Sequence, residues 1–302
     1  MTKKSVSHGI FLVLTLTLAF FSCVSNHQLV SVQLYKERSA SLYVPDEFLW
    51  QKIENADFAE YFFFENRDYP VRYHCVRIDL SFPRLEIITF PKDDSDFAHK
   101  KGMRTDYFKG LSGKQFAQAY NPLVSVNTAP FGGKDGRWSA LVKITSTRKI
   151  RGIHIVERVE LSPPVERYAA LCLTRTEDGF VAKIVAHQTE DAVSDADFAF
   201  GGFFSILSDF QKNDFARLSN DSRTAVGLSA DGRTLYLLVV EGEWQADSHG
   251  LTYPECADIM LALGAKDAMQ MDGGGSSSLF INGKNALSYT TSRKNAVFLG
   301  FR

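Results

Sequence analysis

The chain has 302 residues, and 34 Lys and Arg residues against 35 Asp and Glu residues leave a formal net charge of −1. This balance excludes the broad basic surface that binds nucleic acid, so we predict no nucleic-acid partner. Hydrophobic residues make up 45% of the sequence, which excludes a disordered chain and supplies a sizeable core.

The first 22 residues are typical of an export signal. Two Lys residues precede an apolar run over residues 10–21, and this run is too short to span a bilayer, which takes about 20 residues. Cys23 follows a small residue, as in a bacterial lipobox, although bulky Phe residues stand before that position. We predict removal of residues 1–22 and a lipid anchor on Cys23, in the periplasm or at the surface of a bacterial cell envelope. An ordinary cleaved signal with a nearby Cys is the alternative.

Residues 23–70 carry weak structural signals. Their aromatic cluster at 58–64 shows no clear period, so we interpret them as a packing arm or tether, with a short helix as the alternative. Three Cys residues remain beyond Cys23, and an odd number argues against a disulfide framework. Each lies in an apolar stretch, so we predict buried thiols.

The remainder, residues 71–302, is predicted to form one domain. Residues 71–80 alternate between apolar and polar side chains, which indicates a half-buried strand. A second strand is predicted at 85–90 and a polar loop at 92–102. A Ser-x-x-Gln capping box begins a helix over residues 112–120.

A short strand over residues 123–126 then ends at Asn127. Further strands are predicted at residues 140–144, 152–156, 168–174, 180–186 and 198–204.

The last third of the chain has the clearest pattern. An Asp-Gly turn joins strands at 225–229 and 234–241. A Thr-x-x-Glu capping box begins a helix over residues 252–263. Strands follow at 268–271, 279–281, 285–287 and 296–301. Strands outnumber helices, which favours an α+β fold with a mixed, strand-rich sheet and a few packed helices.

One segment stands out chemically: Asp272 follows a short apolar strand and precedes three Gly and three Ser residues. Glycines let the backbone approach a ligand, and successive amides in such a turn can bind an anion. The segment lacks the pattern of a nucleotide-binding loop. A functional loop and a purely structural turn remain as alternatives.

The sequence resembles the phosphodiester glycosidase family over residues 70–302. The resemblance is carried by an ordered set of motifs, namely Arg223-Thr224-Ala225, Gly250-Leu251-Thr252 and the run from Asp272 to Ser277. Weaker similarity extends to residues 127–131, 200–204 and 293–296.

This resemblance implies an exported hydrolase of carbohydrate metabolism that cleaves a sugar-1-phosphodiester. The sugar would be similar to N-acetylglucosamine, within envelope or host glycans. Asp272 would act as nucleophile or base at the anomeric carbon, and Arg223 would clamp the phosphate. Asn127 would bind a sugar hydroxyl, and Glu241 is a candidate second carboxylate. The predicted substrate-binding residues are Gly273, Gly274, Gly275, Ser276, Ser277, His249, Gly202 and Arg293.

Two departures from the family pattern bear on the site. Residues 128–130 replace glycines, and Glu243 stands where the family has Arg. No cofactor is predicted to be required, with a Ca or Mg ion held by Asp272 and Glu241 as an alternative. Two other functions stay open, a non-catalytic carbohydrate-binding surface lipoprotein and a metal-dependent phosphodiesterase that cleaves the P–O bond.

Overall fold

The computed structural model describes residues 39–133, 145–215, 219–242 and 247–302. The predicted export signal with Cys23, the predicted strand at 140–144 and Glu243 lie outside these residues. Residues 40–215 and 220–302 form one compact unit, and the described Ser39 and Ser219 belong to a second one. Within the described ranges, no helix has the length and apolar character needed to cross a membrane.

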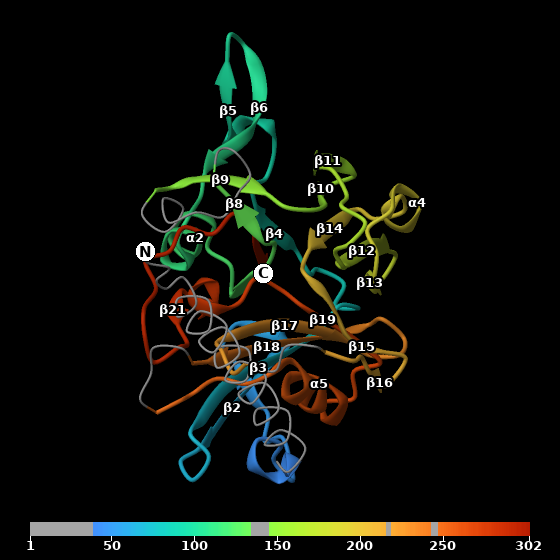
Figure 1. Ribbon diagram of the computed structural model, residues 1–302. Helices are drawn as coiled ribbons and strands as arrows, with labels where there is room; N and C mark the ends of the chain where they lie inside the picture. Colours follow the sequence, from blue (N-terminus) through green and yellow to red (C-terminus); the bar gives the residue numbers. More distant parts are fainter. Residues whose placement is uncertain (1–38, 134–144, 216–218, 243–246) are drawn as a thin grey trace, which may run out of the picture. The chain divides into compact units, whose positions relative to one another are not determined.

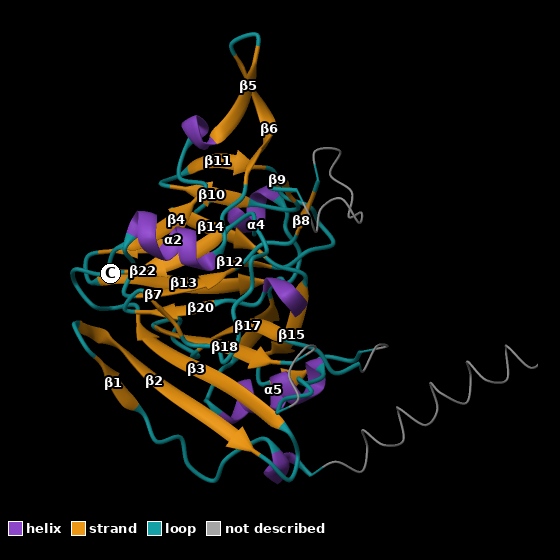
Figure 2. Ribbon diagram, turned by 90° about the vertical axis from the view of Figure 1, so that its left-hand side faces the viewer, coloured by secondary structure: helices purple, strands orange, loops and turns teal. Residues whose placement is uncertain are grey.

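The unit is built on an eight-stranded sheet in which neighbouring strands are antiparallel. In order across the sheet, the strands are β1 (Gln51–Ile53), β2 (Ala56–Asn66), β3 (Val71–Asp79), β18 (Thr234–Glu241), β17 (Arg223–Leu228), β19 (Asp267–Gln270), β15 (Phe204–Ser208) and β16 (Gln211–Lys212). Figure 2 shows β2 lying along β3, with β1 outside it.

Alternate side chains of these strands leave the sheet on opposite faces. On β3, Tyr73 and Cys75 belong to a core cluster shared with helix α5 (Tyr253–Ala262), whereas Val76 and Ile78 belong to the large core on the other face. Figure 1 shows α5 against the sheet beside β15 and β18. We call the face opposite α5 the inner face.

Three smaller sheets share the large core with the inner face. One contains β11 (Val159–Ser162), β10 (His154–Val156), β14 (Phe198–Gly201), β12 (Ala170–Thr176) and β13 (Gly179–Val185). Another contains β21 (Lys284–Asn285), β20 (Leu279–Ile281), β7 (Val124–Asn127), β22 (Phe298–Phe301) and β4 (Ile87–Phe90). The third contains β5 (Phe97–Lys100), β6 (Met103–Lys109), β9 (Thr147–Ile150) and β8 (Phe131–Gly132).

Both predicted capping boxes are present and begin helices. The Ser112 hydroxyl accepts from the Gln115 amide at 3.3 Å at the start of α2 (Gly113–Tyr120). At the start of α5, the Glu255 carboxylate accepts from the Thr252 amide at 2.8 Å. The shorter helices are η1 (Ala40–Leu42), η2 (Asp94–Asp96), α4 (Glu190–Val193) and η3 (Gly274–Ser276).

The predicted α+β, strand-rich fold is confirmed, and so are the buried thiols of Cys75, Cys172 and Cys256. Two predicted segments differ. Residues 40–70 are no separate arm, because the compact unit begins at Ala40 and β2 pairs with β3 from Asn66 opposite Val71 to Ala59 opposite Ile78. The predicted loop at 92–102 contains η2 and β5, because β5 pairs with β6.

Candidate active site

Residues 271–278, which we call the acid loop, leave the end of β19 and are tied to the neighbouring strands. The Asp272 amide donates to the Thr128 carbonyl at 2.8 Å, just after β7. The Gly274 amide donates to the Ser222 carbonyl at 2.7 Å, just before β17. The acid loop is therefore fixed where β7, β17 and β19 meet.

Asn127, the last residue of β7, binds the acid loop through its side chain. Its side chain is 1% exposed. Its amide nitrogen donates to the Asp272 carbonyl at 2.6 Å, and its amide oxygen accepts from the Ser278 amide at 3.0 Å and from the Thr224 hydroxyl at 3.1 Å. These contacts support a positioning role for Asn127 in place of the predicted bond to a sugar hydroxyl.

Asp272 is the carboxyl group of the acid loop, and its side chain is half-buried. Burial raises the pKa of this carboxyl to about 7, although a hydrogen bond with Ser276 and the charges of Arg293, Arg148 and Arg151 act in the opposite direction. A carboxyl group with a pKa near neutrality can serve as a base or a nucleophile at physiological pH.

Arg293 lies directly over the acid loop. Its Nη1 donates to the Ser276 hydroxyl at 3.3 Å, and a Cβ added to Gly275 would lie 2.7 Å from its Nη2. A side chain at position 275 would therefore displace the guanidinium from its place against the acid loop. The Thr291 hydroxyl donates to the Gly275 carbonyl at 2.9 Å and so anchors the segment that carries Arg293. The structure thus brings together the predicted residues Asp272, Ser276 and Arg293.

A second guanidinium, that of Arg148 on β9, is completely buried beside them. Its Nε donates to the Lys294 carbonyl and its Nη1 to the Thr147 carbonyl, the latter at 2.8 Å. Its Nη2 is buried without a hydrogen-bond partner among the described residues. Burial lowers the pKa of Arg148 to about 10, with the like charge of Arg293 acting in the same direction, so the group stays charged at pH 7.

Arg148 and Arg151 were not among the predicted site residues. The sequence holds a signal for the first, because Arg148 and Ile150 occupy the same face of a strand and an inward Ile implies an inward Arg. A buried guanidinium with an unused donor costs free energy unless an anion satisfies it. We therefore regard Arg148, Arg151 and Arg293 as the candidate anion-binding groups.

The acid-loop amides contribute less to an anion cradle than predicted. The amides of Asp272, Gly274, Ser276, Ser277 and Ser278 all donate within the protein. Among the described residues, this leaves the amides of Gly273 and Gly275 for a ligand. The Ser277 hydroxyl contacts the Thr224 hydroxyl at 3.2 Å and is buried, so it holds the loop in place.

Gly202 lies at the junction of β14 and β15. A Cβ at this position would lie 2.7 Å from the Gln270 carbonyl at the end of β19, so a glycine allows the close approach of the two strands. Gly202 therefore supports the strand that leads into the acid loop.

Arg223 is not placed with Asp272. Its backbone begins β17, but its guanidinium lies 4.0 Å from the Tyr253 ring centroid and donates to the Leu251 carbonyl at 2.9 Å, on the α5 face of the sheet. The neighbouring Thr224 side chain points to the inner face, where it contacts Asn127. The predicted phosphate clamp at Arg223 is thus on the wrong face of the strand, because side chains alternate.

Glu241, at the end of β18, is 1% exposed and already bonded. His74 Nε2 lies 2.8 Å from its carboxylate, and the Ser288 amide and hydroxyl both donate to it. Burial alone would raise the pKa of Glu241, but the hydrogen bonds from His74 and Ser288 outweigh it, so the pKa is lowered. The Tyr61 hydroxyl extends this network to His74 Nδ1 at 2.7 Å.

These contacts support a structural role for Glu241, which ties the segment after β21 to the large sheet. His249 is exposed, and its amide donates to the Pro70 carbonyl at 2.9 Å. Among the described residues, no group of three or more His, Cys, Asp or Glu side chains is arranged to hold a metal ion.

Known proteins resemble this chain in fold. A hypothetical protein from Synechocystis superposes with a TM-score of 0.59 at 13% identity, over 85% of this chain and 64% of that chain, so the chain spans less than two thirds of its length. The zebrafish N-acetylglucosamine-1-phosphodiester alpha-N-acetylglucosaminidase catalytic domain, auto-inhibited by its pro-peptide, superposes with a TM-score of 0.59 at 16% identity, over 83% of this chain and 86% of that chain.

A comparison with proteins of curated function found no match. The sequence model of the phosphodiester glycosidases matches residues 124–302, which include β7, the acid loop, Arg148, Arg151 and Arg293. The chain therefore belongs to the phosphodiester glycosidase family of hydrolases, as its motifs predicted.

Proposed function

We propose that this protein hydrolyses a sugar-1-phosphodiester at the bond between the anomeric carbon and the phosphate oxygen. The observation that carries the proposal is the pairing of one carboxyl group of raised pKa, Asp272, with the guanidinium groups of Arg293, Arg148 and Arg151. A carboxylate suits reaction at the anomeric carbon, and guanidinium groups suit the phosphate.

In the proposed reaction, the ionised Asp272 either attacks the anomeric carbon as a nucleophile or acts as a base that removes a proton from the attacking water. The bond between the anomeric carbon and the phosphate oxygen breaks, and water supplies the new oxygen on that carbon. One proton of the water stays on the sugar hydroxyl, and the other is taken up by the phosphate monoester. Phosphate is a good leaving group, so the site needs charge stabilisation more than a strong acid. Arg293 and Arg148 would supply it from fixed positions.

The sugar we propose is similar to N-acetylglucosamine, within envelope or host glycans. The resemblance to a zebrafish domain named for N-acetylglucosamine-1-phosphodiester supports this choice. Running the reaction in oxygen-18 water tests the bond that breaks. Label in the sugar supports the proposal, and label in the phosphate would assign the protein as a phosphodiesterase instead. Glycan binding without any product would assign it as a carbohydrate-binding protein.

We further propose that no metal ion is required and that the protein is exported and anchored through a lipid on Cys23. Full activity after treatment with a chelator is the expected result for the first proposal, and loss of activity restored by Ca or Mg would contradict it. For the second, metabolic labelling with a fatty acid should mark the wild type but not Cys23→Ser. Equal labelling of both proteins would rule out that anchor.

A further inference from the structure

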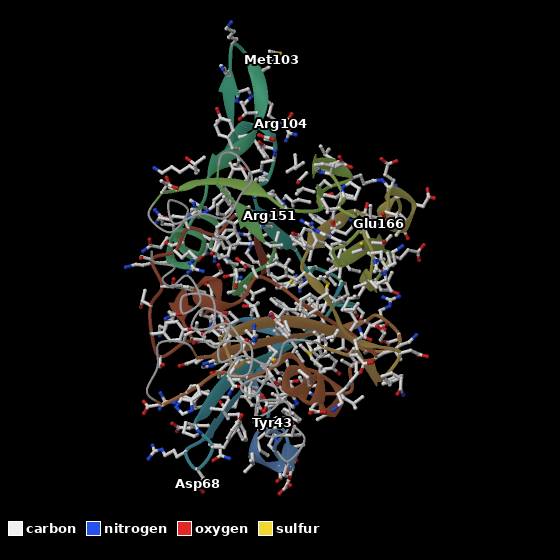
Figure 3. All side chains as sticks on the ribbon, viewed as in Figure 1. Tyr43, Asp68, Met103, Arg104, Arg151 and Glu166 are labelled. Carbon is white, nitrogen blue, oxygen red and sulfur yellow. The ribbon has the colours of Figure 1, made fainter. Side chains whose placement is uncertain are left out.

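A cavity of about 480 Å³ adjoins the candidate active site at Arg151. Its walls come from β6, β9, β11 and the segment that follows β11. Figure 3 labels Arg104, on the strand β6, and Arg151, in the segment after β9. The charged residues of the lining are Arg104, Arg151, Arg167, Lys149 and Asp106.

This lining has four cations and a single carboxylate. Lys149 pairs with Asp106, and Arg104 pairs with Asp94 at 3.3 Å, an acid that is 68% exposed. Arg167 has no carboxylate partner among the described residues, and its guanidinium lies 5.0 Å from the Tyr168 ring centroid. The residues that line the cavity therefore carry a net positive charge, because their one carboxylate, Asp106, pairs with Lys149.

The two walls of this cavity are fixed to each other by one buried side chain. Gln188 is 1% exposed, and its amide oxygen accepts from the Ile153 amide at 2.8 Å and from the Val165 amide at 3.0 Å. Its amide nitrogen donates to the Ala169 carbonyl at 2.7 Å. The segments that carry Arg151 and Arg167 are thus held at a constant separation, as a preorganised ligand site requires.

A short stretch of chain connects this cavity to the reacting carboxyl group. The Thr128 carbonyl accepts from the Asp272 amide at 2.8 Å, and the Pro130 carbonyl accepts from the Arg151 amide at 2.9 Å. The charge of Arg151 acts on Asp272, although Arg151 also lines the cavity. A phosphate bound between Arg151 and Asp272 would direct its second ester group into the cavity.

We propose that the cavity is the acceptor subsite, and that it selects diesters whose acceptor carries an anionic group in addition to the bridging phosphate. A second phosphate or a carboxylate fits this chemistry, because Arg167 can form paired hydrogen bonds with either oxyanion. The inference rests on the proposed function, since it assigns the other half of the same substrate.

The test compares three diesters of N-acetylglucosamine 1-phosphate that differ only at the end of the acceptor, namely glycerol, glycerol 3-phosphate and glycerate. The wild type should cleave the two anionic diesters with kcat/KM roughly tenfold above that of the glycerol diester, as a charge-assisted contact implies. This ratio should fall as ionic strength rises, since Arg167 is exposed and salt screens its charge.

Arg167→Gln should bring the ratio close to one. Arg84→Gln is the matched control, because Arg84 is exposed and lies outside the cavity, and it should keep the wild-type ratio. A ratio near one in the wild type, or the same ratio in Arg167→Gln, would overturn the acceptor subsite. A preference for the phosphate over the carboxylate would identify which oxyanion the cavity takes.

Calorimetric binding to Asp272→Asn separates this inference from the proposed function. If the wild type cleaves none of the diesters but Asp272→Asn binds the anionic ones through Arg167, the hydrolase proposal fails and the subsite stands. If the wild type cleaves all three equally, the hydrolase proposal stands and the subsite fails.

Discussion

Two carboxyl groups stand at the ends of β18 and β19, the strands on either side of β17 in the large sheet, and their surroundings differ. Glu241 ends β18 and receives hydrogen bonds from His74 and Ser288, which lower its pKa against the effect of burial. Asp272 follows β19, and burial raises its pKa to about 7 despite Ser276 and three nearby arginines.

The difference separates a structural carboxylate from a reactive one. Glu241 has its bonding capacity filled by the protein and is 1% exposed, so it has little left for a substrate. Asp272 is half-buried, and burial disfavours its charged form and so raises its pKa. Carboxyl groups whose environments push their pKa values apart commonly have different roles in one site.

The largest expected effect is on the reaction rate. Asp272→Asn should lower kcat/KM by roughly 10²- to 10⁴-fold, because the amide can act neither as base nor as nucleophile. Glu241→Gln should have a much smaller effect. Steady-state kinetics with a sugar-1-phosphodiester would measure both, with circular dichroism as the control for folding. A folded Glu241→Gln protein that loses as much activity as Asp272→Asn would restore Glu241 as a catalytic carboxylate.

The next largest effect is on stability, and here Glu241 is the residue whose substitution should cost more. Glu241→Gln should lower the free energy of unfolding at pH 7 by about 1–3 kcal/mol, because it weakens the buried hydrogen bonds that His74 and Ser288 make with the carboxylate. Glu86→Gln removes an exposed partner of Arg302 and should cost less than about 1 kcal/mol. Urea denaturation would compare the two. Equal losses would show that the Glu241 network contributes no more than a surface ion pair.

The pH dependence of stability should also have opposite signs at the two positions. The folded pKa of Glu241 is lowered, so its contribution is present at neutral pH and is lost as pH falls through that pKa. The folded pKa of Asp272 is raised to about 7, so its ionisation costs stability as pH rises from about 4 to 7.

Asp272→Asn should therefore be more stable than the wild type at pH 8, by no more than about 4 kcal/mol, and the gap should close near pH 4. Denaturation midpoints measured across this range would show it. A stability difference that does not change with pH would mean that burial does not raise the pKa of the Asp272 carboxyl group.

The smallest effect concerns Ser276. Its hydrogen bond lowers the pKa of Asp272, so Ser276→Ala should move the rising limb of kcat/KM from about pH 7 to higher pH, by up to about one unit. Ser95→Ala, on an exposed turn, should leave the limb in place. A shift of this limb to lower pH in Ser276→Ala would show that the Ser276 hydroxyl favours the protonated Asp272. A falling limb in place of the rising one would mean that Asp272 reacts in its protonated form.

Local chemistry made part of this molecule predictable. The capping boxes at Ser112 and Thr252 use residues three apart, and both begin helices as predicted. Asp272 was found because a strand end followed by glycines is also a local pattern. Arg293 was included on a family motif, and the structure brings it to the acid loop.

Other features depend on contacts that the sequence does not display. The two faces of β17 can be told apart by alternation, but which face meets the acid loop depends on the neighbouring layers, so Arg223 was misplaced. Arg148 reaches the site only because β9 pairs with β8 and β6. The strand β2 was missed because its run of aromatic residues hides the alternation, and β5 because its exposed side chains have no apolar period.

The pairing of β2 with β3 also bears on which fragment of the chain can be studied. The family match begins at residue 124, yet β18 is paired with β3 along its whole length, and β2 covers the other edge of β3. A protein trimmed to residues 124–302 would expose the backbone of β18 as a long open edge, which favours aggregation. Trimming to residue 71 would move that open edge to β3. Since the compact unit begins at Ala40, expression should start no later than that residue.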